Sequence, residues 1–229
     1  MIELNHIYNE DCLEGMKRIP GNSVDLVCTD PPYLIRYKTG HRKHEHKFCH
    51  EIANDDNEVL ISSYIAELYR LLKDNTAAYI FCSSKTVDFF RKECIKAGFS
   101  IKNEIIWVKN NWTAGDLQAQ YGQQYEVILY ANKGRCKING KRLSDVWQFP
   151  RVCGAKQIHQ NQKPLPLIEQ IIVKSSQEGG AVFDGFMGSG TTAIACMNTN
   201  RNYIGFELDK EYYDLSIKRI KERELNLNL

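Results

Sequence analysis

The sequence predicts an α/β domain in which a mostly parallel sheet of seven strands carries helices on both faces. Short apolar runs of strand length alternate with segments of helical periodicity, a pattern typical of parallel sheets crossed by helices. One of these runs passes through a glycine-rich segment, residues 185–190, into a helical pattern, as strand-to-helix turns in such sheets do. At 229 residues the chain can bury one full core, so residues 1–229 are expected to form a single domain.

Seven apolar runs bounded by turn residues are the predicted strands. They are His6–Asn9, Val24–Thr29, Ala77–Ser83, Ile105–Val108, Val127–Tyr130, Ala181–Asp184 and Tyr203–Glu207. Helical periodicity predicts long helices over residues 58–72 and 86–97, and shorter ones after residues 11, 164, 190 and 209. Three stretches, 34–57, 110–124 and 133–162, predict no regular structure and are expected to be loops.

The composition is that of an ordinary globular domain, with 43% hydrophobic residues, 25% charged residues and a net charge of +2. It excludes collagen, a coiled coil and a disordered chain. No apolar run approaches the roughly 18 residues that span a bilayer, and residues 1–11 are too polar for a signal peptide. We therefore expect a cytoplasmic protein without a membrane partner.

The eight cysteines never form a CxxC pair, and Cys28 and Cys82 lie inside apolar runs, which favours core thiols over disulfides or a zinc site. Residues 41–50 contain four histidines and one cysteine. Their spacing matches no common zinc finger, and the neighbouring cations would repel a divalent ion. We therefore expect no metal.

Positive charge is concentrated in two stretches. Residues 34–50 hold five Lys/Arg against one Glu (+4), and residues 133–163 hold eight against one Asp (+7), so the remainder sums to −9. One such stretch alone would favour solvated loops, whereas two together favour a polyanion such as nucleic acid. Residues 34–57 are then expected to form a mobile loop that contacts it. The candidate contacts are Arg36, Lys38, Arg42, Lys43, Arg135, Lys137, Lys141, Arg142 and Arg151.

The segment from Ala181 to Ala193 has the pattern of a strand, a glycine turn and a helix start. Gly188 and Gly190 would let backbone N–H groups approach a ligand, and the following helix N-terminus would favour an anionic group. Glu207 ends the next predicted strand and can accept both hydroxyl protons of a ribose. These features predict a nucleoside-binding crevice, although a tight structural turn without a ligand and a dinucleotide fingerprint also fit the letters.

The position of this crevice in the chain predicts a circularly permuted, Rossmann-like order. Only 22 residues follow Glu207, enough for one helix, so the remaining strands of the sheet must come from the N-terminal half. A fold tolerates such a permutation when its natural termini lie close together.

The tetrapeptide Asp30-Pro31-Pro32-Tyr33 directly follows a buried strand pattern. The two prolines fix the backbone and remove two N–H donors, which leaves carbonyl groups and the Asp30 carboxylate as rigid acceptors beside an aromatic ring. Such a corner suits a planar amine, as on a base turned out of a duplex. The alternative is a strand-terminating turn with an incidental tyrosine. Trp107 precedes loop 110–124 and Trp112 lies near its start, and each fits packing and base contact equally.

These two motifs together resemble the S-adenosylmethionine-dependent amino-methyltransferases of DNA, and their order resembles the permuted beta group of that family. Nearly the whole chain takes part in the resemblance. Residues 9–13 resemble the family segment near the cofactor adenine, residues 124–127 the strand before its recognition region, and residues 159–164 its cofactor-side segment. The family usually has Thr-x-Lys-Pro where this chain has Gln160-Asn161-Gln162-Lys163-Pro164.

The resemblance implies a role for each matching residue. Asp30, Pro31, Pro32 and Tyr33 would hold the target base and form the catalytic corner. Glu207 would hold the ribose of S-adenosylmethionine, and residues 133–162 would form a small irregular target-recognition region. The implied cofactor-binding residues are Asp11, Cys12, Asp30, Lys163, Pro164, Asp184, Phe186, Gly188, Ser189, Gly190, Thr191 and Glu207.

The implied reaction is methyl transfer to N6 of a flipped-out adenine in double-stranded DNA, with S-adenosylhomocysteine as coproduct. The main alternative is an N4-cytosine enzyme, which the family more often marks with Ser at the position of Asp30. A nicotinamide-dependent oxidoreductase and an inactive nucleic-acid-binding module are alternatives from other classes. Many members of the family form dimers, so a homodimer is a candidate assembly.

Overall fold

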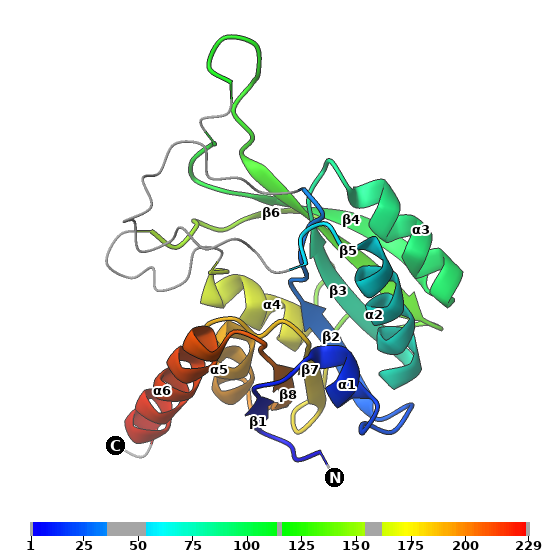
Figure 1. Ribbon diagram of the computed structural model, residues 1–229, viewed down its shortest axis with the longest axis vertical. Helices are drawn as coiled ribbons and strands as arrows, with labels where there is room; N and C mark the ends of the chain where they lie inside the picture. The colour runs from blue at the N-terminus through cyan, green and yellow to red at the C-terminus, as the bar shows by residue number, and fades with distance from the viewer. Residues whose placement is uncertain (1, 36–53, 114–115, 154–161, 228–229) are drawn as a thin grey trace.

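The computed structural model describes residues 2–35, 54–113, 116–153 and 162–227, and the structural statements below concern these residues. An eight-stranded sheet runs through the centre of the molecule in the order β1-β8-β7-β2-β3-β5-β4-β6 (Figure 1). The strands are β1 (His6–Tyr8), β2 (Val24–Thr29), β3 (Leu72–Cys82), β4 (Ser100–Val108), β5 (Tyr125–Lys133), β6 (Val146–Gln148), β7 (Ala181–Asp184) and β8 (Asn202–Phe206).

Strand direction divides the sheet into two parts. The five strands β1, β8, β7, β2 and β3 pair in parallel, whereas β5 runs antiparallel to both β3 and β4. The short edge strand β6 pairs in parallel with β4. The last strands of the chain thus lie beside the first ones, which confirms the predicted permuted, mostly parallel sheet.

Six helices cover the two faces of the sheet at the predicted positions (Figure 1). The helix after residue 209 was predicted to be one of the shorter ones, but with 18 residues it is the longest of the six. Apolar side chains on each helix face pack on the strands and form two buried clusters, one on either side. One face carries α1 (Cys12–Met16), α2 (Glu58–Leu71) and α3 (Val87–Ala97), and the other carries α4 (Leu165–Ser175), α5 (Thr191–Asn198) and α6 (Lys210–Leu227). No helix in these described parts of the chain is both long and apolar enough to cross a membrane.

The sheet departs from the prediction in the number and length of its strands. The eighth strand, β6, lies inside the stretch 133–162 that was predicted to be irregular; its three residues are too few to show a period, and pairing with β4 forms it. Strand β3 begins at Leu72 rather than Ala77, because Leu72 pairs with Val24 of β2 and Thr76 pairs with Lys133 of β5. Cys28 and Cys82 are buried in the core, as expected.

The carboxyl ends of the parallel strands form the edge that matters for function. Strand β2 ends at Thr29, directly before Asp30; β7 ends at Asp184, and β8 ends directly before Glu207. Parallel strands side by side finish at the same edge of a sheet, so the two sequence motifs meet there.

Candidate functional site

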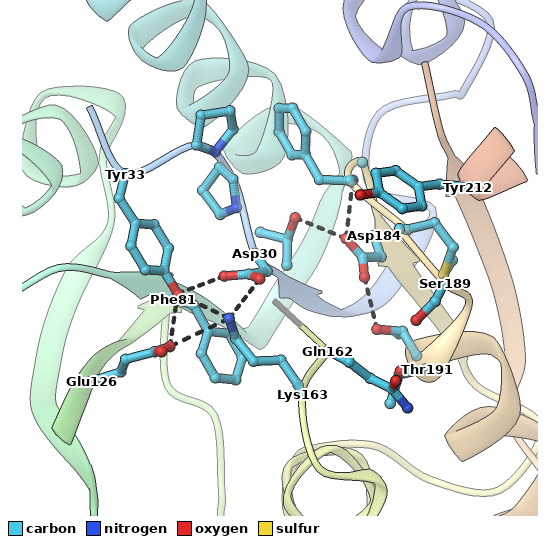
Figure 2. Close-up of a pocket in the computed structure, with 18 of the residues that line it drawn as sticks. Asp30, Tyr33, Phe81, Glu126, Gln162, Lys163, Asp184, Ser189, Thr191 and Tyr212 are labelled. Atoms are coloured by element: carbon cyan, nitrogen blue, oxygen red, sulfur yellow. Dashed lines mark hydrogen bonds and ion pairs between the residues drawn. The ribbon is translucent and has the colours of Figure 1, made fainter. Parts of the chain in front are cut away.

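A cavity of about 580 Å³ opens at this edge of the sheet and contains both motifs. Its lining includes the complete tetrapeptide Asp30 to Tyr33 and most of the segment from Asp184 to Thr192. Figure 2 shows Asp30, Tyr33 and Lys163 gathered on one side of the cavity, with Asp184 and Thr191 on the other. The two corners therefore face a common space. A reaction between two substrates requires such an arrangement, because both must be held close together.

The corner at Asp30 is held by hydrogen bonds to both of its carboxylate oxygens. The Tyr33 hydroxyl donates to Oδ1 at 2.6 Å, and the Lys163 ammonium donates to Oδ2 at 2.6 Å. Thr86 fixes the Tyr33 backbone by donating to its carbonyl oxygen at 2.7 Å. Burial raises the pKa of Asp30, while the charge of Lys163 acts in the opposite direction.

Glu126, at the start of β5, joins this corner to two lysines. Its Oε2 lies 3.3 Å from Lys163 Nζ and 2.9 Å from the Tyr33 hydroxyl, and its Oε1 accepts a hydrogen bond from Lys109 at 2.5 Å. Burial opposes the charge of Glu126, but the two ammonium groups outweigh it and lower its pKa to about 2. The cluster therefore pairs two carboxylates with two ammonium groups.

On the other side of the cavity, Asp184 accepts three hydrogen bonds. Oδ2 accepts from the Thr192 hydroxyl at 2.7 Å, and Oδ1 accepts from the Thr29 hydroxyl at 3.0 Å and the Phe186 amide at 3.1 Å. Burial raises the pKa of Asp184 to about 6 in spite of these donors. The Asp184 carboxylate thus links the end of β2, at Thr29, to the glycine turn and the start of α5.

Glu207 holds the glycine turn from the end of β8. Its carboxylate accepts from the amides of Gly188 at 2.7 Å and Asp209 at 2.8 Å. Gly188 and Gly190 have φ values of 53° and 80°, a left-handed conformation that favours glycine. Helix α5 begins directly after Gly190 without a side-chain cap, so its first amides face the cavity end of the helix.

Thr29 connects the two corners physically. Its hydroxyl bonds Asp184 and lies 2.7 Å from the Tyr64 hydroxyl, which in turn accepts from the Gly185 amide at 3.1 Å. Because Thr29 directly precedes Asp30 in the chain, this network ties the position of the Asp30 corner to that of the glycine turn.

Most of the predicted cofactor residues line the cavity. They are Asp11, Cys12, Asp30, Lys163, Asp184, Phe186, Gly188, Ser189, Thr191 and Glu207. Pro164 and Gly190 are not among the lining residues, although each adjoins one in the chain. Asp11 also caps helix α1 by accepting from the Leu13 amide at 2.8 Å. The Lys163 ammonium contacts Asp30, a residue that the resemblance assigns both to the target base and to the cofactor.

The predicted DNA contacts are spread more widely. Arg36, Lys38, Arg42 and Lys43, together with most of the loop 34–57 and the histidine-rich segment, lie outside the described residues. Arg151 lines the cavity, and Arg142 lies at a second hollow of the surface. The Arg135 amide bonds Asn75, at the sheet edge opposite the cavity, and Lys137 and Lys141 follow on the same connection to β6.

Trp107 and Trp112 take different roles. Trp107 is 2% exposed and donates from its ring nitrogen to the Phe149 carbonyl at 2.8 Å, so it packs in the core, and it also borders the cavity. Trp112 is 67% exposed and remains available for contact.

Sequence reasoning missed the functional placement of several residues. Glu126 was named only as part of the segment 124–127, with no role of its own, and Lys109 was not named, although a carboxylate at the start of an apolar strand is a usable signal. Thr29 and Tyr64 carried no signal, because a threonine in a strand and a tyrosine in an amphipathic helix are ordinary core residues.

Comparison with known proteins agrees with the geometry. The profile of a family described as DNA methylase, N6_N4_Mtase, matches residues 24–218. The chain is 30% identical over 251 residues to the DNA adenine methyltransferase YhdJ of Escherichia coli K12, covering 95% of this chain and 83% of that protein. It is 32% identical to the protein in the crystal structure of the M1.HpyAVI-SAM complex, with a TM-score of 0.73 and coverage of 94% and 98%.

The PvuII DNA methyltransferase, which is cytosine-N4-specific, has a TM-score of 0.77 at 17% identity, with coverage of 95% and 86%; this likeness shows the fold alone. The profile spans most of the chain, including both cavity corners, and thereby confirms the family that the sequence motifs predict. The chain belongs to the N6/N4 family of DNA methylases.

Proposed function

We propose that this DNA methylase transfers the methyl group of S-adenosylmethionine to N6 of an adenine turned out of double-stranded DNA. The single observation that carries the proposal is the shared cavity: a rigid acceptor corner at Asp30 and a glycine turn held by Glu207 face the same space, with Thr29 linking them. A two-substrate transfer needs this arrangement because both reactants must be held in contact.

The residues of the glycine-turn side fit S-adenosylmethionine. The Glu207 carboxylate suits the two ribose hydroxyls, and the uncapped amides at the start of α5 suit the carboxylate of the methionine part. Phe186 adds an apolar ring surface, and Asp184 and Asp30 place negative charge around a positively charged sulfonium. When bound, S-adenosylmethionine supplies an electrophilic methyl group.

The acceptor corner explains how a weakly nucleophilic amine reacts. The lone pair of an exocyclic amino nitrogen is delocalised into the base. Asp30 and the Pro31 carbonyl accept its two hydrogens, which favours a pyramidal nitrogen with a localised lone pair. A carbon–nitrogen bond would then form as the carbon–sulfur bond breaks, S-adenosylhomocysteine would leave as the neutral thioether, and the methylated nitrogen would lose one proton to water. Positioning and oriented dipoles supply the rate enhancement, and effective concentration alone is worth about 7–11 kcal/mol.

Adenine is favoured over cytosine by the residue at position 30. The resemblance associates Asp at this position with adenine enzymes and Ser more often with N4-cytosine enzymes. The relative YhdJ, named as an adenine methyltransferase, supports the same choice. The alternative of a nicotinamide-dependent oxidoreductase gains no support from the comparisons reported above, in which the matching family and relative are DNA methylases.

The test is to express the protein in cells that lack DNA methylation, digest their DNA to nucleosides and identify modified bases by mass spectrometry. N6-methyladenine is expected. Detection of N4-methylcytosine instead would show that the target base is cytosine. If the protein folds and binds DNA but the DNA contains no modified base, the inactive nucleic-acid-binding module would be favoured. Calorimetric titration with S-adenosylmethionine and with NAD separates the methylase from the oxidoreductase.

Two further expectations belong with this proposal. Buried free thiols such as Cys28 and Cys196 suit a reducing compartment, which supports work in the cytoplasm. A homodimer rests on the family resemblance, and light scattering on the purified protein tests it.

A further inference from the structure

The Lys163 ammonium group lies in the cavity and has no role in the reaction proposed above. Only 9% of the Lys163 side chain is exposed, and its ammonium lies 2.6 Å from Asp30 Oδ2, 3.1 Å from the Tyr33 hydroxyl and 3.3 Å from Glu126 Oε2. Nζ also lies 5.1 Å from the centre of the Phe81 ring. A buried lysine held by this many partners has no freedom to act as a general surface charge.

We propose that Lys163 is a positioning residue for Asp30, and that Glu126 holds Lys163 in place for this task. The ammonium fixes the orientation of the carboxylate that receives the base amino group and preserves its negative charge. The inference rests on the proposed function of Asp30 and adds two residues to it. It also moves Lys163 from the cofactor side, where the sequence motif placed it, to the base side.

The geometry leaves room for the substrate. An ionised carboxylate offers about four acceptor sites on its two oxygens, and Lys163 and Tyr33 occupy one on each. The remaining sites are free to accept a base N–H. A protonated Asp30 would lose its negative charge and present one O–H donor in place of an acceptor, so its hydrogen bond to the base N–H would be weaker and would compete with Lys163 and Tyr33 for the remaining oxygen.

The charges around Asp30 explain why it needs this lysine. Glu126 faces it from β5 and Asp184 from β7, and both disfavour a second negative charge, as does burial. Lys163 is the cation in direct contact, whereas Lys109 reaches the cluster through Glu126. The Tyr33 hydroxyl has one proton to share between two carboxylates. Bound S-adenosylmethionine would add the positive charge of its sulfonium near Asp30. The pH profiles of parent and variants are therefore compared at a saturating concentration of S-adenosylmethionine.

Removing Lys163 and removing the charge of Glu126 are expected to shift the pH dependence of methyl transfer in opposite directions. Without Lys163, the pKa of Asp30 rises, so in Lys163→Met the acid limb of single-turnover methyl transfer moves to higher pH. A shift of one unit lowers the rate about tenfold on that limb. Without the Glu126 charge, the pKa of Asp30 falls, so in Glu126→Gln the acid limb moves to lower pH while the maximal rate drops, because Lys163 loses its anchor. Lys163→Arg keeps the charge and is expected to restore the parental limb in part.

A matched control removes a lysine–aspartate pair elsewhere. Lys73 pairs with Asp25 at 2.8 Å at the other end of β3, and Lys73→Met is expected to leave rate and pH profile unchanged. S-adenosylmethionine affinity, measured by calorimetry, is expected to stay within about twofold of the parent in Lys163→Met. A large loss of affinity with an unmoved pH limb would return Lys163 to the cofactor side and overturn the inference.

A measurement that needs no turnover separates this inference from the proposed function. Carboxyl carbon NMR of the free protein gives the titration of Asp30 directly, assigned by its loss in Asp30→Asn. Its midpoint is expected to rise in Lys163→Met and to fall in Glu126→Gln. Equal midpoints in parent and both variants would refute the inference even in an active enzyme. A parent protein that methylates no DNA, yet shows the two shifts, would refute the function and leave the charge coupling standing.

Discussion

At the scale of single residues, Thr29 shows how an ordinary core position acquires a functional task. Its hydroxyl lies between Asp184 and the Tyr64 hydroxyl at hydrogen-bond distance from both, and the next residue in the chain is Asp30. A buried polar group with two partners is costly to replace, because both partners lose a bond together. We therefore treat Thr29 as the mechanical link between the two halves of the cavity.

Replacing Thr29 by the isosteric valine tests this link. Thr29→Val is expected to lower the free energy of unfolding by about 1–3 kcal/mol, since Asp184 and Tyr64 each lose a partner. It is also expected to slow methyl transfer more than it weakens S-adenosylmethionine binding. Urea unfolding and single-turnover kinetics measure the two effects. Thr76→Val removes a hydroxyl bonded to the Lys73 carbonyl at the far end of β3, and should leave transfer intact.

Asp30 itself separates binding from chemistry. Asp30→Ala is expected to bind S-adenosylmethionine nearly as tightly as the parent, because Glu207 and the glycine turn remain, and to lose methyl transfer. Lys163 keeps Glu126 as a partner in this variant, so the fold should survive. Transfer of radiolabelled methyl to DNA is the measurement. Equal transfer rates in variant and parent would remove Asp30 from the catalytic assignment.

At the scale of elements, the glycine turn between β7 and α5 depends on backbone conformation as well as on space. Gly190 has a φ of 80°, and a β-carbon there would lie 3.0 Å from the Ser216 side chain of α6. The turn thus fits between a strand end and a packed helix. Glycine is required there for two independent reasons.

Gly190→Ala is expected to destabilise the fold by more than the roughly 1–2 kcal/mol that the left-handed conformation costs an ordinary residue, and to weaken S-adenosylmethionine binding. Gly179→Ala is the matched control: its φ is 76°, but a β-carbon meets nothing within 4 Å, and it lies outside the cavity lining. This control should show the conformational cost alone, with unchanged cofactor affinity. Chemical denaturation and calorimetry compare the two, and equal effects would contradict the crowding at Ser216.

At the scale of the whole molecule, strand direction decides where the positive charges lie. Strand β5 runs antiparallel to β3, so it starts beside the cavity at Glu126 and ends beside Thr76 at the opposite edge. The basic residues that follow it begin at that opposite edge, and the chain returns to the cavity only at Arg151. A stretch that is continuous in sequence therefore spans the molecule from one edge to the other.

This arrangement predicts unequal contributions to DNA binding. Arg151→Ala is expected to weaken DNA binding and reduce the slope of log K against log salt by about one, because one phosphate contact is lost. Lys137→Ala, an exposed cation from the same stretch, should leave both nearly unchanged. Fluorescence anisotropy over a salt series measures both. An equal loss from the two variants would mean that DNA covers both edges.

The sequence by itself determined the permuted parallel sheet, the two corners of the cavity and the family, because each motif carries its local geometry: two prolines fix one corner, and glycines with a strand end fix the other. Only the tertiary structure decided that Lys163 and Glu126 belong with Asp30, that Trp107 is core, and that β6 is a strand. The physical reason is that pairing across the sheet joins residues whose separation in the chain leaves no periodic signal. Burial and strand direction, rather than proximity in the sequence, therefore determine which charged side chains pair with each other, as for Asp30, Lys163 and Glu126.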